Sequence, residues 1–283
     1  MNVRRARFAG SWYPGDETSC RQEIDSYVDQ IVSISSTDIK RIGGIVPHAG
    51  WFYSGQIACN VIYCLKERID PDVIVIYGMH LPPNGPNFIM TEGYWETPLG
   101  KIEIDEEVAG HLTKRFQFIV ETPENARQDN TIELQLPFIK YFFPKVRIVP
   151  IGVPPNPTAL EMGKYIAMLS GKLGLNIKFI GSTDLTHYGT NYGMTSQGKG
   201  TKALNWVKYE NDRRIVELMM EMESEEIIKE ALKNQNACCA GAAAAAIESG
   251  KQLGAERAES LIYATSYDKT PSDSFVGYVG VVF

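Results

Sequence analysis

The segment Asp72–Tyr77 (DVIVIY) is a continuous run dominated by β-branched residues, and it constrains the fold more than any other feature. Such a run predicts a strand that is buried on both faces, as in parallel sheets covered by helices. Short apolar segments at 42–46, 146–152 and 177–181 repeat this pattern and alternate with helical segments. The alternation predicts an α/β fold with a mixed, mostly parallel central sheet that is flanked by helices.

Helical spacing of apolar residues fills most of the sequence between these strands. No linker rich in proline, glycine or serine, no charge block and no internal repeat interrupts the alternation. We therefore expect residues 1–283 to form a single domain. The expected helices are 16–34, 54–67, 105–115, 131–142, 157–171, 200–233 and 240–249, and the further strands are 116–120, 259–266 and 275–283.

Charge and hydropathy exclude several classes of partner. The net charge is −6 and the pI is about 5.4, and no basic patch is present, which argues against nucleic acid as a partner. No apolar stretch is long enough for a transmembrane helix, and the first residues lack the apolar run of a signal peptide. The five cysteines match no zinc-finger spacing, so we expect a cytoplasmic protein with mostly free thiols and no membrane partner.

Three histidines follow expected strands. His48 comes after strand 42–46, His80 after Asp72–Tyr77, and His187 after strand 177–181 with Asp184 three residues before it. Each histidine alone is more often a structural residue held by one hydrogen bond. Because ligands bind at the carboxyl ends of strands in open α/β sheets, the three together favour one metal-type or catalytic site.

Two adjacent cysteines, Cys238 and Cys239, precede the alanine-rich helix 240–249. The amino terminus of a helix stabilises a thiolate, which could bind a metal beside imidazoles. The alternative is a small buried thiol pair that allows the helix to pack closely on the sheet. Asp184 and His187 likewise fit either a capped turn or an acid/base pair.

Six segments carry a family resemblance, and they run in order along nearly the whole chain. They are AGSWYPGD (9–16), VPHAGWFYSG (46–55), TPLGKIEID (97–105), IELQLPF (132–138), STDLTHYG (182–189) and NACCAGA (236–242). Together they resemble the Memo (mediator of cell motility) family. That family is similar in fold to the class III extradiol ring-cleaving dioxygenases, so the resemblance implies a dioxygenase-like fold with a pocket of the non-haem iron type.

The resemblance implies specific site residues. By motif, the metal ligands are His48, His80 and Cys238, and Asp184 and His187 are adjacent catalytic pocket residues. A site of two histidines and one thiolate implies Fe²⁺ or copper as the cofactor, with Zn²⁺ as a further candidate.

Three positions depart from the family pattern. Met79 stands where the loop before the second histidine usually has asparagine, and Asn130 stands where histidine is frequent. Cys239 replaces the glycine that usually follows the family's cysteine. These changes bear on the identity of the metal more than on the fold.

Three functions follow from the residues and the resemblance. The first is a metal-dependent redox enzyme, dioxygenase-like, that acts on a small aromatic or phenolic substrate. The second is a non-catalytic adaptor that binds a peptide or small ligand in the same pocket, and the third is a zinc hydrolase. The sequence favours no particular oligomeric state.

Overall fold

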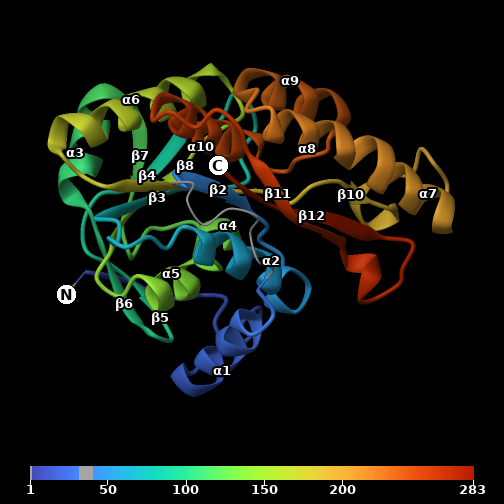
Figure 1. Cartoon of the computed structure of the whole chain (residues 1–283), viewed down its shortest axis with the longest axis horizontal. Coiled ribbons are helices and arrows are strands. Elements are labelled where there is room, and N and C mark those ends of the chain that lie inside the picture. The colour runs from blue at the N-terminus through green and yellow to red at the C-terminus, as the bar shows by residue number, and fades with distance from the viewer. Residues whose placement is uncertain (1, 32–40) are drawn as a thin grey trace.

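The computed structural model describes residues 2–31 and 41–283. Within this part of the chain, strands from all regions of the sequence form one sheet, with helices on both sides of it (Figure 1). The strands are β1 (Val3–Arg4), β2 (Gly43–Val46), β3 (Val73–Gly78), β4 (Asn87–Met90), β5 (Tyr94–Thr97), β6 (Gly100–Ile104), β7 (Phe118–Glu121), β8 (Arg147–Gly152), β9 (Ile177–Ser182), β10 (His187–Tyr188), β11 (Glu259–Thr265) and β12 (Phe275–Val282).

The centre of the sheet is parallel, which confirms the expected fold class. The main path runs in the order β1-β5-β6-β8-β3-β9-β2-β12-β10, and the five strands from β6 to β2 all pair in parallel. Antiparallel pairs join β5 to β6 on one side and β12 to β2 on the other. Every residue of β2, β3 and β9 is buried, as expected for strands covered on both faces.

The helices divide into two layers. One core packs α1, α2 and α5 against one face of the sheet, and a second packs α3, α6 and α8–α10 against the other, as Figure 1 shows. The helices are α1 (Glu17–Val28), α2 (Trp51–Cys64), α3 (Glu106–Arg115), α4 (Asn130–Glu133), α5 (Leu136–Phe142), α6 (Pro157–Leu173), α7 (Gly200–Trp206), α8 (Asp212–Met220), α9 (Ser224–Asn234) and α10 (Ala240–Gln252). In the described part of the chain, no helix is both long and apolar enough to cross a bilayer.

Helix α10 lies very close to the sheet because both surfaces lack large side chains. A Cβ atom added to Gly181 of β9 would lie 2.7 Å from the backbone oxygen of Ala242. One added to Gly241 would lie 2.5 Å from the backbone oxygen of Pro154. The alanine run therefore serves to bring the start of α10 against the carboxyl end of β9.

Two expected helices are interrupted. The segment 131–142 divides into α4 and α5, since Pro137 lacks the N–H that would continue the helix. The segment 200–233 contains a π-helical turn at Val207–Asn211, and its first part ends at Met220, shortly before Met222, whose φ is +59°. Neither glycine nor proline marks this second break, so the sequence alone indicated one long helix.

Other differences concern strands and one helix end. The three strands β4, β5 and β6 were not predicted, because each has only four or five residues. Helix α1 ends at Val28 rather than at residue 34, and residues 32–34 lie outside the described part of the chain.

Candidate metal centre and aromatic pocket

Four potential ligands meet at the carboxyl ends of the central strands. His48 follows β2, His80 follows β3, and Cys238 and Cys239 lie directly before α10. One donor atom from each of the four lies within 4.8 Å of the others. His48, His80 and Cys238, the ligands that the resemblance implied, are therefore adjacent in space.

His48 is held by hydrogen bonds that determine which ring nitrogen carries its proton. The side chain is 1% exposed, and Nδ1 lies 3.0 Å from Oγ of Ser182. That hydroxyl donates its own hydrogen to the carbonyl of Thr131 at 2.7 Å, so it accepts from Nδ1 of His48. Nε2 of His48 consequently faces His80 and Cys238.

His80 is oriented in the same way by a carboxylate. Its Nδ1 lies 3.4 Å from Oδ2 of Asp129, and Thr131 donates to the other oxygen from its backbone N–H and its hydroxyl. Burial alone would raise the pKa of Asp129, but hydrogen bonds from His80 and Thr131 lower it to about 2. A charged Asp129 accepts from Nδ1 and turns Nε2 of His80 toward His48.

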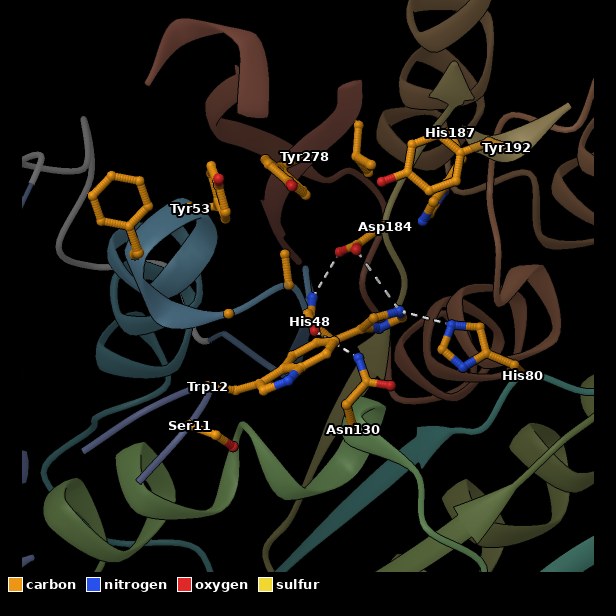
Figure 2. Close-up of a pocket in the computed structure, with 14 residues that line it drawn as sticks. Ser11, Trp12, His48, Tyr53, His80, Asn130, Asp184, His187, Tyr192 and Tyr278 are labelled. Carbon is orange, nitrogen blue, oxygen red and sulfur yellow. Dashed lines mark hydrogen bonds and ion pairs between the residues drawn. The ribbon is translucent and has the colours of Figure 1, made fainter. Parts of the chain in front are cut away.

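The two Nε2 atoms approach each other closely. The distance between Nε2 of His48 and Nε2 of His80 is 3.2 Å, and Figure 2 shows this contact as a dashed line. Burial alone would lower the pKa of His80, but Asp129 and Cys238 raise it to about 10. Asp129 and Cys238 therefore favour positive charge on His80.

Cys238 adds a sulfur to the cluster beside the Nε2 atoms of both histidines. Its Sγ lies 3.3 Å from Nε2 of His48 and accepts a hydrogen bond from the backbone N–H of Asp184 at 3.3 Å. Burial would raise the pKa of Cys238, but the Cys239 thiol and the charge of His48 lower it well below its usual value. These contacts favour a thiolate, which is the form that binds metal.

Asp184 lies beside the cluster. One carboxylate oxygen accepts from the backbone N–H of His48 at 2.7 Å, and the other lies 3.9 Å from its Nε2. Burial raises the pKa of Asp184, although the charges of His48 and His187 oppose that rise. The carboxyl group is thus able to hold a proton at the wall of the pocket.

His187 lies in the same pocket but apart from the four ligands. It belongs to β10, and its Nδ1 lies 3.1 Å from the backbone oxygen of Leu185. Its ring packs edge-on against Tyr192, with 5.0 Å between the ring centres. Because Nδ1 donates to Leu185, Nε2 of His187 remains available to a bound ligand.

A cavity of about 520 Å³ opens above His48 and His80. Its wall is mostly aromatic, and the rings of Trp12 and Phe52 are substantially exposed. Figure 2 shows side chains from both ends of the sequence gathered around it. The lining residues are Ser11, Trp12, His48, Ala49, Gly50, Phe52, Tyr53, His80, Asn130, Asp184, His187, Tyr192, Val276 and Tyr278.

Three supporting residues were not selected from the sequence as part of the site. Asp129 and Ser182 orient the two histidines, and Asn130 donates from its side chain to the backbone oxygen of His48 at 2.8 Å. Asp129 also accepts from the backbone N–H of Thr131 as the N-cap of α4. The sequence signal for Asp129 was this capping position before an expected helix, whereas Ser182 begins the motif at 182–189 and Asn130 departs from the family pattern.

Comparison with known proteins identifies the family. A model of the family described as "Memo-like protein" matches residues 4–282. A MEMO1 family protein of Thermococcus onnurineus is 34% identical over 291 residues, covering 99% of each chain. One from Pyrococcus furiosus is 33% identical over 290 residues, covering 99% of this chain and 98% of that protein.

A solved structure shows the same fold at low sequence identity. An uncharacterized protein from Escherichia coli K12 superposes with a TM-score of 0.54 and 11% identity, covering 85% of this chain and 98% of that one. The family match spans nearly every residue, including all six motifs and the four clustered donors. The chain therefore belongs to the Memo-like protein family.

Proposed function

We propose that the cluster binds an iron or copper ion and that the protein is a metal-dependent oxidoreductase, dioxygenase-like, acting on a small aromatic substrate. The observation that carries the proposal is the approach of the two Nε2 atoms at 3.2 Å. Both rings donate from Nδ1, so once Nε2 loses its proton the two lone pairs face each other beside the Cys238 sulfur. Such an arrangement is stabilised by a shared cation.

The donor set suits a transition metal. Imidazole binds iron, copper and zinc, and a thiolate shifts the preference toward softer ions than magnesium or calcium. His48, His80 and Cys238 would hold the ion, and the ion would supply electron transfer and Lewis acidity at the floor of the cavity. Asp129 and Ser182 would keep both rings in the ligating tautomer.

The remaining pocket residues would bind the substrate and move its protons. Trp12, Phe52 and Tyr53 offer aromatic surfaces on which a planar ring can stack. Asp184, with its raised pKa, and His187, with a free Nε2, would exchange protons with a phenolic hydroxyl group. A pocket that stacks a planar ring and exchanges protons with a hydroxyl group is suited to a phenol or catechol.

The first test is the metal content of protein purified anaerobically without chelator. We expect near-stoichiometric iron or copper in the wild type and strong depletion in His48→Ala and Cys238→Ser. His111→Ala is the matched control, because His111 lies on α3 and contributes no atom to the cluster. Equal metal content in all four proteins, or no metal in the wild type, would disprove the metal site. A wild type that contains zinc but neither iron nor copper would favour a hydrolase.

A screen of phenols and catechols with metal-loaded protein tests the catalytic role. We expect His187→Gln to lower turnover by roughly 10²–10⁴-fold through loss of acid/base catalysis while the metal content stays unchanged. Unchanged turnover in this variant would remove His187 from the mechanism.

A second candidate is a non-catalytic module that binds a small ligand or an aromatic residue of a peptide. The exposed rings favour it, since Trp12 is 41% and Phe52 is 61% exposed at the rim of the cavity. Quenching of Trp12 fluorescence by a tyrosine-containing peptide, equal in metal-loaded and metal-depleted protein, would support this role. No quenching by the peptide, together with turnover of a phenol, would favour the catalytic role over the binding role.

A further inference from the structure

Cys239 lies in the cluster together with the three ligands proposed above. Its sulfur is 3.8 Å from that of Cys238, and its donor atom lies within 4.8 Å of those of His48 and His80. Zinc-type bond lengths of about 2.0–2.3 Å place the ligands of a tetrahedral ion roughly 3.3–3.8 Å apart. Three separations within the cluster, 3.2 Å, 3.3 Å and 3.8 Å, are close to those of such a tetrahedron, and the others are no longer than 4.8 Å.

The backbone holds both sulfurs on the same side of the cluster. Cys239 is the residue before α10, and its extended φ of −129° allows the adjacent side chains to converge. Its N–H donates to the hydroxyl of Thr183 at 3.0 Å, while the N–H of Cys238 donates to the backbone oxygen of Asp184 at 3.1 Å. Two consecutive hydrogen bonds to the segment after β9 therefore fix the positions of both thiols.

The cavity reaches the cluster on the side of the two histidines and not on the side of the two cysteines. His48 and His80 line the cavity, but neither cysteine does, and Cys239 is only 3% exposed. The fourth donor therefore comes from the protein interior. A site with four protein ligands is closed, whereas a catalytic centre keeps a position for an outside ligand.

We propose that Cys239 is a fourth metal ligand, so that the resting centre is a closed site of two histidines and two thiolates. The proposal rests on the metal centre proposed above and adds that an outside ligand gains access when Cys239 leaves the metal. Replacement of Cys239 thus opens the fourth position and leaves His48, His80 and Cys238 in place.

Cobalt(II), loaded alone into the full-length protein, is a suitable probe. Thiolate ligands give cobalt an intense ultraviolet charge-transfer absorption, and tetrahedral geometry gives intense visible bands. We expect Cys239→Ser and Cys239→Gly to retain one equivalent of cobalt and to lose about half of the charge-transfer intensity, since one of two thiolates is removed. Cys64→Ser is the matched control, because Cys64 is a buried free cysteine on α2 outside the cluster.

Azide then reports whether the fourth position is open. We expect azide to change the visible bands of Cys239→Gly and to leave those of the wild type and Cys64→Ser unchanged. Circular dichroism of each apoprotein establishes that the variants are folded. Two replacements of different size are included so that a folding defect in one still leaves the other to be measured.

The outcomes separate the two proposals. Unchanged charge-transfer intensity in both Cys239 variants, or a response of the wild type to azide, would overturn the role of Cys239 and leave the three-ligand site intact. Failure of the wild type to bind cobalt, in a folded protein, would overturn the metal centre itself. Halved intensity with azide sensitivity confined to the Cys239 variants would establish the fourth ligand.

Discussion

At the scale of single residues, the chemistry of the site depends on groups that do not touch the proposed metal. Ser182 accepts from Nδ1 of His48, and Asp129 accepts from Nδ1 of His80. A histidine without such a partner is free to present either tautomer to the cluster. These two positioning residues therefore direct both Nε2 lone pairs to one point.

Asp129→Asn is expected to weaken metal binding by roughly 10–100-fold, the usual cost of losing an outer partner of a histidine ligand. An asparagine oxygen still caps α4 through Thr131, but the amide then places a donor where His80 Nδ1 also donates. Competition with a chromophoric chelator measures the affinity.

The exposed Asp70 provides the control for this substitution. Asp70→Asn removes the same charge from the surface, away from the cluster, and should leave the affinity unchanged. Equal affinities for Asp129→Asn and the wild type would show that the ring of His80 is oriented without the carboxylate.

At the scale of elements, the close packing of α10 on β9 determines where the thiols lie. The first turn of α10 follows Cys238 and Cys239 directly, and the helix contacts β9 through its backbone. Any outward movement of this helix would carry the cysteines away from the histidines. The stability of the packing and the affinity of the site are therefore linked.

Gly181→Ala is expected to destabilise the protein by about 1–3 kcal/mol, as overpacking of a core does, and to weaken metal binding as well. The added methyl group would lie 2.7 Å from the oxygen of Ala242 and 3.0 Å from Cα of Ala243, and these backbone atoms cannot rotate aside. Urea denaturation gives the stability, and cobalt titration gives the affinity.

Gly171→Ala is the matched control because Gly171 is an exposed residue of α6 with open space around its Cα. It should be neutral or stabilising by about 0.5–1 kcal/mol, since alanine is the better helix former. Stability and affinity of Gly181→Ala at wild-type levels would contradict the proposed coupling between α10 and the site.

At the scale of the whole molecule, buried polar groups join elements that are distant in sequence. Asp212, at the start of α8, is fully buried. Its carboxylate accepts from the backbone N–H of Thr186 at 3.0 Å and from the hydroxyl of Tyr263 on β11 at 2.7 Å. Burial raises its pKa to about 7, although both hydrogen-bond partners lower it.

The raised pKa of Asp212 predicts how stability depends on pH. The folded protein holds a proton on this carboxyl group that the unfolded chain releases near pH 4, so its stabilising effect is lost as the pH rises toward and through 7. At about 1.4 kcal/mol per pKa unit, the loss amounts to a few kcal/mol.

Urea denaturation at pH 5 and pH 8 tests this prediction. The wild type should lose more free energy of unfolding between these values than Asp212→Asn, whose amide does not ionise and still accepts from Thr186 through its single oxygen. The difference between the two proteins in this change of free energy gives the contribution of Asp212 apart from that of the other titrating groups. Parallel profiles would mean that Asp212 ionises in the folded protein as it does in the unfolded chain.

The amino-acid sequence by itself determined the α/β fold class and the position of most central elements. The buried runs at β2, β3 and β9 were predictable because strands covered on both faces need continuous apolar sequence. The sites of His48 and His80 after β2 and β3 were predictable, since the parallel strands of one sheet end at the same edge.

Tertiary structure decided the remaining features, because they depend on contacts between residues far apart in the chain. Strands β5 and β6 take their form from pairing with each other and with β1 and β8, and the break after Met220 has neither glycine nor proline to mark it. Cys238 lies 190 residues from His48, and a hydrogen-bond acceptor such as Asp129 has no motif that links it to a histidine. Spacing along the chain could nominate the histidines, but only folding could place His187 on the wall of the pocket and Cys239 within the cluster.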